Sequence, residues 1–251
     1  MLLAIDVGNT NTVLGLFESD DLVHSWRINT NARQTADEIE LTFRGLLADQ
    51  HVSGIALCST VPSVLTEMRT MLARYYSDVP TVIVEPGIKT GVPITTDNPK
   101  EVGADRIVNS LAAFTLFDGP CIVVDFGTST NLDVVSAKGE FIGGALAPGI
   151  EISLDALASR AAQLRKVELA VPRSVIGKNT VEALQSGMIY GFAGQVDGLV
   201  DRILEELDSE VTAVVATGGL ANIVVAESET ITHHEPNLTL IGLKLIFERN
   251  T

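Results

Sequence analysis

The first residues that could do chemistry are Asp6-Val7-Gly8-Asn9-Thr10, which follow an apolar segment at residues 2–5. A glycine in such a turn lets the backbone approach an anion closely, and exposed N–H groups donate to phosphate oxygens. The Thr10 hydroxyl can donate to the same oxygens. Asp6 cannot bind phosphate itself and is suited to holding a hydrated cation that screens the phosphate charge. The pattern therefore predicts a phosphate-binding turn that works with a metal ion.

The same pattern returns in the second half of the chain. Asp125-Phe126-Gly127-Thr128 follows the apolar segment 121–124, and a glycine pair, Gly218-Gly219, follows the apolar segment 211–216. A single turn of this kind is equally consistent with an aspartate that only satisfies the backbone of a loop. Two copies at matching places in two halves favour phosphate binding over that structural interpretation.

A third set of candidate residues, Gly103-Ala104-Asp105-Arg106, opens a predicted helix. An acid in the first helical turn is favoured by the helix dipole, so Asp105 could have only a structural role. In the functional interpretation, Asp105 accepts the proton of a substrate hydroxyl and Arg106 binds an anionic substrate group with both guanidinium arms. Phosphoryl transfer needs such positioning and charge stabilisation more than covalent chemistry.

Apolar periodicity indicates the elements that must position these residues. Thr35-Ala36-Asp37-Glu38 is a capping box that starts a helix. The order βββαβα, with a further strand, occurs twice, which predicts an α/β protein with two duplicated domains, residues 1–117 and 118–251. The expected strands lie at 2–5, 13–17, 22–28, 54–59, 79–84, 121–124, 132–135, 141–146 and 211–216. The expected helices lie at 36–47, 61–76, 103–117, 150–162, 180–207 and 238–248.

Other catalytic motifs are missing. Gly177-Lys178-Asn179 resembles the end of a P-loop, but it has Asn where Ser or Thr is required and lacks the earlier glycine. No GxGxxG, GxSxG or HExxH pattern occurs. His233-His234 lies in a polar stretch and is expected to be a solvated loop, so a histidine-based zinc site is not indicated.

Composition limits the partners and the compartment. The chain has 251 residues, 46% of them hydrophobic, and a formal net charge of −15, which argues against binding nucleic acid. No apolar run is long enough for a membrane helix and no secretory signal is evident, so a cytoplasmic protein without membrane contact is expected. Cys58 and Cys121 give no disulfide framework, and both are expected to be small core residues.

The doubled Asp–Gly turns resemble those of the actin–Hsp70–sugar kinase superfamily, which implies two duplicated ribonuclease-H-like (actin-like ATPase) domains with a nucleotide cleft between them. More narrowly, the whole chain resembles type III pantothenate kinases. The ordered set of motifs gives this resemblance its specificity: Asp6-Val7-Gly8-Asn9-Thr10, Gly103-Ala104-Asp105-Arg106, Asp125-Phe126-Gly127-Thr128, Gly143-Gly144 with Pro148-Gly149, and Gly177-Lys178-Asn179-Thr180.

The resemblance implies ATP-dependent phosphorylation of pantothenate at its primary hydroxyl, the first step toward coenzyme A. It implies that Asp105 is the general base, that Arg106 engages the pantothenate carboxylate, and that Thr180 also reaches pantothenate. Gly103, Ala104, Asp105 and Arg106 would line this substrate site. The first phosphate turn for ATP would consist of Asp6, Val7, Gly8, Asn9, Thr10, Asn11, Thr12 and Val13.

By the same resemblance, hydrated Mg²⁺ would lie near Asp6, and Asp125 would coordinate the K⁺ or NH₄⁺ ion that the family requires. Thr128 would contact ATP, and Gly218-Gly219 would lie beside the adenosine. The family is homodimeric, with its pantothenate pocket at the subunit interface. This chain departs from many relatives at two places. Three residues before Pro99 it has Thr96, where those relatives have a tyrosine, and after the second turn it has Ser129-Thr130, where alanine is frequent.

Two rival functions stay open at the level of sequence. Some proteins on this scaffold are described as transcription accessory factors, so a catalytically silent regulator is one alternative. Intact Gly8, Asp105 and Asp125 favour catalysis over that role. The other alternative is a phosphotransferase or phosphohydrolase of the superfamily that acts on acetate, a sugar or polyphosphate.

Overall fold

The computed structural model describes residues 1–160, 167–207 and 210–251. Within this part of the chain the backbone forms two compact units. Unit 1 comprises Met1–Val92, Asn98–Ala112 and Thr239–Thr251, and unit 2 comprises Pro93–Asp97 and Ala113–Leu238. The sequence predicts a single division between residues 117 and 118. In the structure the C-terminal residues Thr239–Thr251 belong to unit 1 instead. The end of the helix expected at 150–162 lies outside the described residues.

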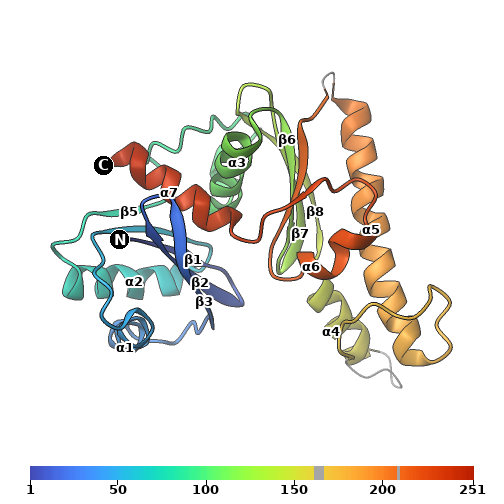
Figure 1. Ribbon diagram of the computed structural model, residues 1–251, viewed down its shortest axis with the longest axis horizontal. Helices are drawn as coiled ribbons and strands as arrows, with labels where there is room; N and C mark the ends of the chain where they lie inside the picture. The colour runs from blue at the N-terminus through green and yellow to red at the C-terminus, as the bar shows by residue number, and fades with distance from the viewer. Residues whose placement is uncertain (161–166, 208–209) are drawn as a thin grey trace. The chain divides into compact units, whose positions relative to one another are not determined.

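Unit 1 is built on a five-stranded mixed sheet with the order β3-β2-β1-β4-β5 (Figure 1). The central strand β1 pairs antiparallel with β2 and parallel with β4. Its strands are β1 Leu2–Val7, β2 Asn11–Glu18, β3 Asp21–Asn29, β4 Gly54–Ser59 and β5 Thr81–Ile83.

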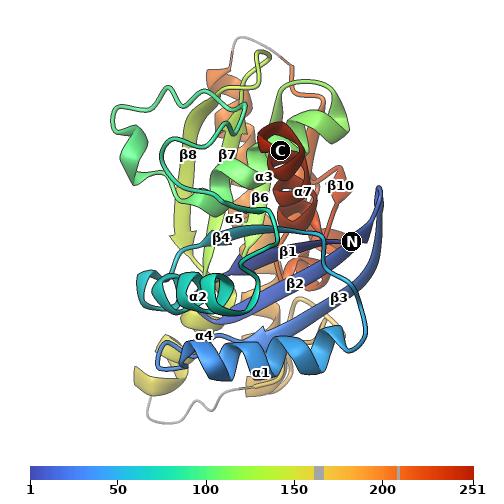
Figure 2. The ribbon, with the colours of Figure 1, turned by 90° about the vertical axis from the view of Figure 1, so that its left-hand side faces the viewer.

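The two faces of this sheet are covered by different helices. Helices α1 (Ala36–Leu47) and α2 (Pro62–Tyr75) cover one face (Figure 2), where Leu3, Ile5 and Val7 belong to the buried core of the unit. The capping box of Thr35 and Glu38 starts α1 as predicted, with both of its reciprocal hydrogen bonds present. Successive side chains of a strand point to opposite faces, so Ala4 and Asp6 face the other way.

On that other face, α7 (Leu238–Asn250) comes very close to the strands because they have glycines there. A Cβ atom on Gly15 would lie 2.7 Å from Leu240 of α7, and one on Gly54 would lie 2.4 Å from Phe247. A Cβ on Gly242 of α7 would in turn lie 2.3 Å from the backbone of Val108, in the N-terminal part of α3 (Ala104–Phe117). Helix α7 therefore belongs to unit 1 by its packing.

Unit 2 repeats the sheet of unit 1. Its order is β10-β9-β6-β7-β8, and β6 pairs antiparallel with β7 and parallel with β9, as β1 does with β2 and β4. Its strands are β6 Cys121–Phe126, β7 Ser129–Val135, β8 Phe141–Pro148, β9 Ala213–Thr217 and β10 His233–His234.

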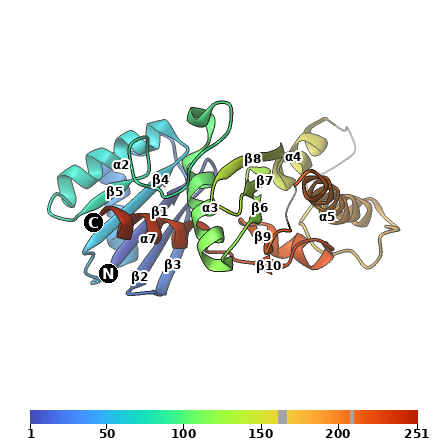
Figure 3. The ribbon, with the colours of Figure 1, turned by 90° about the horizontal axis from the view of Figure 1, so that it is seen from above.

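Helix α5 (Thr180–Glu206) packs along one face of this second sheet (Figure 3), where Phe192 and Val196 share a core with Ile122 and Val124. The remaining elements are α4 Ile150–Arg160, α6 Ala221–Val224 and the short 3₁₀ helices Pro99–Glu101 and Val225–Glu227. The duplicated α/β architecture predicted from the sequence is confirmed.

One predicted loop is wrong. His233 and His234 form the edge strand β10, parallel to β9, where His233 pairs with Val215 and His234 pairs with Ala216. Two adjacent polar histidines give no alternation of apolar and polar residues, which is the pattern that predicts a strand, and both are exposed in the structure. The position of β10 corresponds to that of β5 in the first sheet.

Candidate active site

The first phosphate turn joins β1 to β2 and is fixed by the backbone around it. The Gly8 N–H donates to the Asn11 carbonyl at 3.0 Å, which closes the turn. The Thr30 N–H donates to the Thr10 carbonyl at 2.9 Å, and the Thr60 N–H donates to the Val7 carbonyl at 3.0 Å. Asn9 and Thr10 at the tip are exposed, so a ligand can reach this end of the turn.

Not every residue of this turn offers its side chain to a ligand. Val7 and Thr12 are register partners on the face that packs against α1 and α2, and both are buried. The Thr12 hydroxyl is hydrogen-bonded to that of Thr30 at 2.9 Å. Asp6 and Val13 are register partners on the opposite face. Thr12 therefore stabilises the strand pair, and Asp6 directs its carboxylate to the functional face.

Asp6 lies beside a cysteine whose role the sequence did not reveal. Cys58 is the register partner of Asp6 on β4, and its thiol donates a hydrogen bond to Asp6 Oδ1 at 3.2 Å. Burial raises the pKa of Asp6 to about 6, while the Cys58 hydrogen bond opposes that rise. Cys58 is fully buried, as predicted, but it also positions a carboxylate, and only the pairing of β1 with β4 shows this.

Asp105 is held at the start of α3, as predicted. Burial raises the pKa of Asp105, although the backbone N–H of Arg106 and the Arg106 charge both act to lower it. Gly103 leaves space for this carboxylate, since a Cβ on Gly103 would lie 2.5 Å from Asp105 Oδ1. The negative charge of Asp105 also raises the pKa of Asp6. The structure thus brings together two carboxylates, Asp6 and Asp105, which are distant in sequence.

The second turn joins β6 to β7 in unit 2 and has a similar construction. The Gly127 N–H donates to the Ser129 carbonyl at 3.0 Å, and the Gly149 N–H donates to the Thr128 carbonyl at 3.1 Å. Gly218, directly after β9, has a φ of +92°, and a Cβ there would lie 2.5 Å from Asp125 Oδ1. The turn at Gly218 therefore lies against the Asp125 carboxylate and has no room for a side chain at position 218.

The segment before α5 is hydrogen-bonded to the first turn of that helix. Asn179 is the N-cap and accepts a hydrogen bond from the Glu182 N–H, while Glu182 accepts from the Lys178 N–H and from Arg173. These donors hold the pKa of Glu182 below its usual range. Thr180, the first residue of α5, is exposed.

The predicted residues therefore fall into two sets. Unit 1 holds Asp6, Val7, Gly8, Asn9, Thr10, Asn11, Thr12, Val13, Gly103, Ala104, Asp105 and Arg106, and unit 2 holds Asp125, Thr128, Thr180, Gly218 and Gly219. Across the described ranges, no three His, Cys, Asp or Glu side chains are grouped so that they could hold a metal ion. Any metal here would need ligands from water or from a bound substrate as well.

Comparison with solved structures identifies the class. The chain matches a ROK family glucokinase from Streptomyces griseus in complex with glucose and AMPPNP, with a TM-score of 0.53 and 12% identity over 99% of both chains. It also matches a candidate transcriptional activator of the Baf family from Campylobacter jejuni, with a TM-score of 0.61 and 17% identity over 99% of this chain and 98% of that one. At such identities only the fold is shared. It is the two-domain actin-like ATPase fold of sugar kinases.

Sequence relatives define the family within this class. A family model described as type III pantothenate kinase matches residues 2–202. The type III pantothenate kinase of Frankia alni is 70% identical over 100% of both chains, and that of Salinispora arenicola is 66% identical over 100% of both chains. The chain belongs to the type III pantothenate kinase family. In the described part of the chain, no helix is both long and apolar enough to cross a membrane.

Proposed function

We propose that this protein transfers the γ-phosphate of ATP to the primary hydroxyl of pantothenate, giving 4′-phosphopantothenate in the first step of coenzyme A biosynthesis. One observation carries the proposal beyond family membership. The first phosphate turn and the start of α3 place the carboxylates of Asp6 and Asp105 near enough for one charge to raise the pKa of the other. A carboxylate that can hold a metal ion beside the phosphates and a base for an alcohol are two groups that suit this reaction.

Asp105 accepts a hydrogen bond from the pantothenate hydroxyl and takes its proton as the new phosphorus–oxygen bond forms and the bond from the γ-phosphorus to ADP breaks. In a loose transition state the proton leaves late, so orientation of the nucleophile matters more than basicity. Arg106 follows Asp105 in the first turn of α3, and its guanidinium pairs with the pantothenate carboxylate. Gly103 and Ala104 complete this side of the site.

The Asp6 side chain suits a hydrated Mg²⁺ ion. Its buried carboxylate is destabilised by the nearby Asp105, and a divalent cation would relieve both the burial and the repulsion. Bound Mg²⁺ would neutralise charge on the ATP phosphates. Asn9 and Thr10 at the exposed tip of the turn would then orient those phosphates.

The second turn would serve the rest of the nucleotide. We assign Asp125 to a monovalent cation, K⁺ or NH₄⁺, because Gly127 and Gly218 both approach its carboxylate and place no side chain against it at these two positions. Thr128 would contact ATP, and Gly218-Gly219 would lie beside the adenosine. If this assignment is right, replacement of K⁺ by Na⁺ lowers the rate, and equal rates in the two salts contradict it.

We further propose a homodimer with the pantothenate site at the subunit interface, in the cytoplasm. Unit 2 exposes large apolar side chains on β8, on α4 and around the start of α5, which is unusual for a surface that stays in water. They are Ile142, Leu146, Ile152, Leu157, Val171, Val175, Ile176 and Val181. Thr180 lies among the last of these, so a second chain that covers them would also cover Thr180.

The rival functions find little support. The curated relatives at 62–70% identity are named kinases, so a silent regulator is not favoured. The likeness to a sugar kinase, at 12% identity, shows the fold and gives no support to a sugar substrate.

An ADP-release assay with ATP, Mg²⁺ and K⁺ tests the function against a panel of pantothenate, simple alcohols and sugars. We expect turnover with pantothenate. Asp105→Asn should lower kcat by about 10²–10⁴-fold, with an unchanged circular dichroism spectrum. Undiminished turnover in this variant would remove Asp105 from the mechanism.

A further inference from the structure

A cross-strand row on the functional face of unit 1 contains a cation that the mechanism above does not use. Cys58 on β4, Asp6 on β1, Val13 on β2 and Arg27 on β3 are successive register partners. Directly opposed residues of paired strands share one face of a sheet. Arg27 therefore faces the same side as Asp6, two strands away, or about 10 Å between their Cα atoms.

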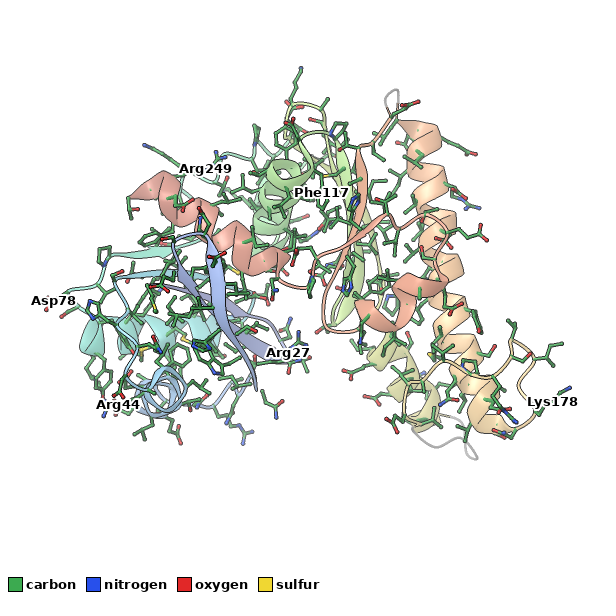
Figure 4. All side chains as sticks on the ribbon, viewed as in Figure 1. Arg27, Arg44, Asp78, Phe117, Lys178 and Arg249 are labelled. Carbon is green, nitrogen blue, oxygen red and sulfur yellow. The ribbon has the colours of Figure 1, made fainter. Side chains whose placement is uncertain are left out.

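The charge of Arg27 acts on the site and is not used elsewhere. It is among the influences that lower the pKa of Asp6. Arg27 is exposed, and it forms no hydrogen bond or ion pair with any other residue that the structure describes. Arg44, Arg69, Arg74 and Lys244 of the same unit are instead paired with carboxylates. Figure 4 shows Arg27 on β3, well apart from Arg44 on α1.

The phosphate turn lacks a cation of its own. Residues 6–13 contain no lysine or arginine, so the turn offers a triphosphate only N–H groups, hydroxyls and amides. Transfer of a phosphoryl group builds up charge on the terminal phosphate, and kinases place cations there. A guanidinium suits this role because its planar fork matches two phosphate oxygens. An arginine side chain is also long enough to cover much of the distance between the two strands.

We propose that Arg27 is a phosphate-binding residue whose guanidinium pairs with the terminal phosphate of the nucleotide at the Asp6–Val13 turn. The inference rests on the proposed function, since it assumes that ATP binds at this turn. We assign Arg27 to the terminal phosphate because this is the phosphate that is transferred. The transfer must occur beside Asp105, which lies on the same face as Asp6. Arg27 would then distinguish ATP from ADP.

Calorimetric titration with Mg²⁺–ATP and Mg²⁺–ADP tests this assignment on Arg27→Gln, Arg27→Lys and wild type. Arg27→Gln should weaken ATP binding by about 10- to 100-fold, as expected for a lost charge-assisted pair. It should change ADP binding by less than about 3-fold, because ADP lacks the phosphate concerned. Arg27→Lys keeps the positive charge but loses the planar fork, so its affinity for ATP should lie between those of Arg27→Gln and wild type.

Arg69→Gln is the matched control. It removes another exposed arginine, from α2, which covers the opposite face of the sheet, and it should leave both affinities unchanged. Equal losses for ATP and ADP in Arg27→Gln, or no loss for either, would overturn the assignment. Failure of the proposed function would look different, because wild type itself would then bind no ATP or would not phosphorylate pantothenate.

Discussion

Asp6 experiences opposing influences from its neighbours. Burial and the charge of Asp105 raise its pKa, whereas the Cys58 thiol and the charge of Arg27 lower it, and the result is a pKa of about 6. In the absence of a metal ion, the ionised carboxylate is therefore disfavoured in the folded protein relative to the unfolded chain. An active site often retains such a group because its ligand needs the charge.

Asp6→Asn should therefore stabilise the metal-free protein while abolishing Mg²⁺-dependent turnover. When a carboxyl has a higher pKa in the folded protein than in the unfolded chain, its stabilising contribution is complete at pH values below the unfolded pKa. That contribution is lost as the pH rises through the folded pKa, here about 6. At pH 8 the variant should exceed wild type by on the order of 3 kcal/mol in free energy of unfolding. Near pH 4 the difference should be much smaller. Urea titrations in EDTA at both pH values measure it, and a variant less stable than wild type at pH 8 contradicts the account.

Gly103→Ala should damage catalysis more than the fold. The added Cβ would lie 2.5 Å from Asp105 Oδ1, so the carboxylate must move away from its present position. A displacement of about 1 Å can lower a rate by about 10²-fold, so we expect kcat to fall by about 10- to 100-fold. Gly45→Ala in α1 is the control, because its Cβ meets nothing within 4 Å. Steady-state kinetics and thermal melting of both variants separate the two effects, and a normal kcat for Gly103→Ala would show that Asp105 need not stay in place.

At the scale of elements, the sequence was most informative where local chemistry decides the structure. The capping box at Thr35 requires two local hydrogen bonds, and the strand–Asp–x–Gly pattern requires one turn, so both could be predicted. The strand at His233 could not, because two exposed polar residues pair only in response to β9. The position of α7 also depends on distant residues, since Gly15 and Gly54 make room for it from other strands. Likewise, the Cys58–Asp6 contact follows from the pairing of β4 with β1, which no single segment encodes.

The turn after β9 provides a prediction at this scale. Gly218 has a positive φ, and a Cβ there would lie 2.7 Å from the Phe126 backbone as well as close to Asp125. Gly218→Ala should therefore lower the free energy of unfolding by about 2 kcal/mol or more and weaken ATP binding. Gly87→Ala is the control for backbone strain alone, since Gly87 has a φ of +105° and its Cβ would meet nothing within 4 Å. If the two variants melt alike and bind ATP alike, close packing at Gly218 has no special role.

At the scale of the whole molecule, both substrates are anions and the chain has a formal net charge of −15. In the proposed assignments, Arg106, Arg27 and bound cations reverse the field locally so that ATP and pantothenate can bind. The exposed apolar side chains described above belong to unit 2, whereas Arg27 and Arg106 belong to unit 1. They are suited to contact with a second copy of the chain, because a symmetric dimer would bury the same side chains twice.

Two inactive variants should restore activity to each other if each pantothenate site takes residues from both chains. Light scattering should first show a particle of twice 26.7 kDa. Asp105→Asn and Thr180→Trp, the second of which blocks the pocket sterically, should each be inactive alone. In a mixed dimer, one site would then contain both substitutions and the other neither. Random assortment should return about a quarter of wild-type activity. If Asp105 and Thr180 of the same chain served one site, every site in the mixed dimer would have one defect, and the co-expressed variants would stay inactive.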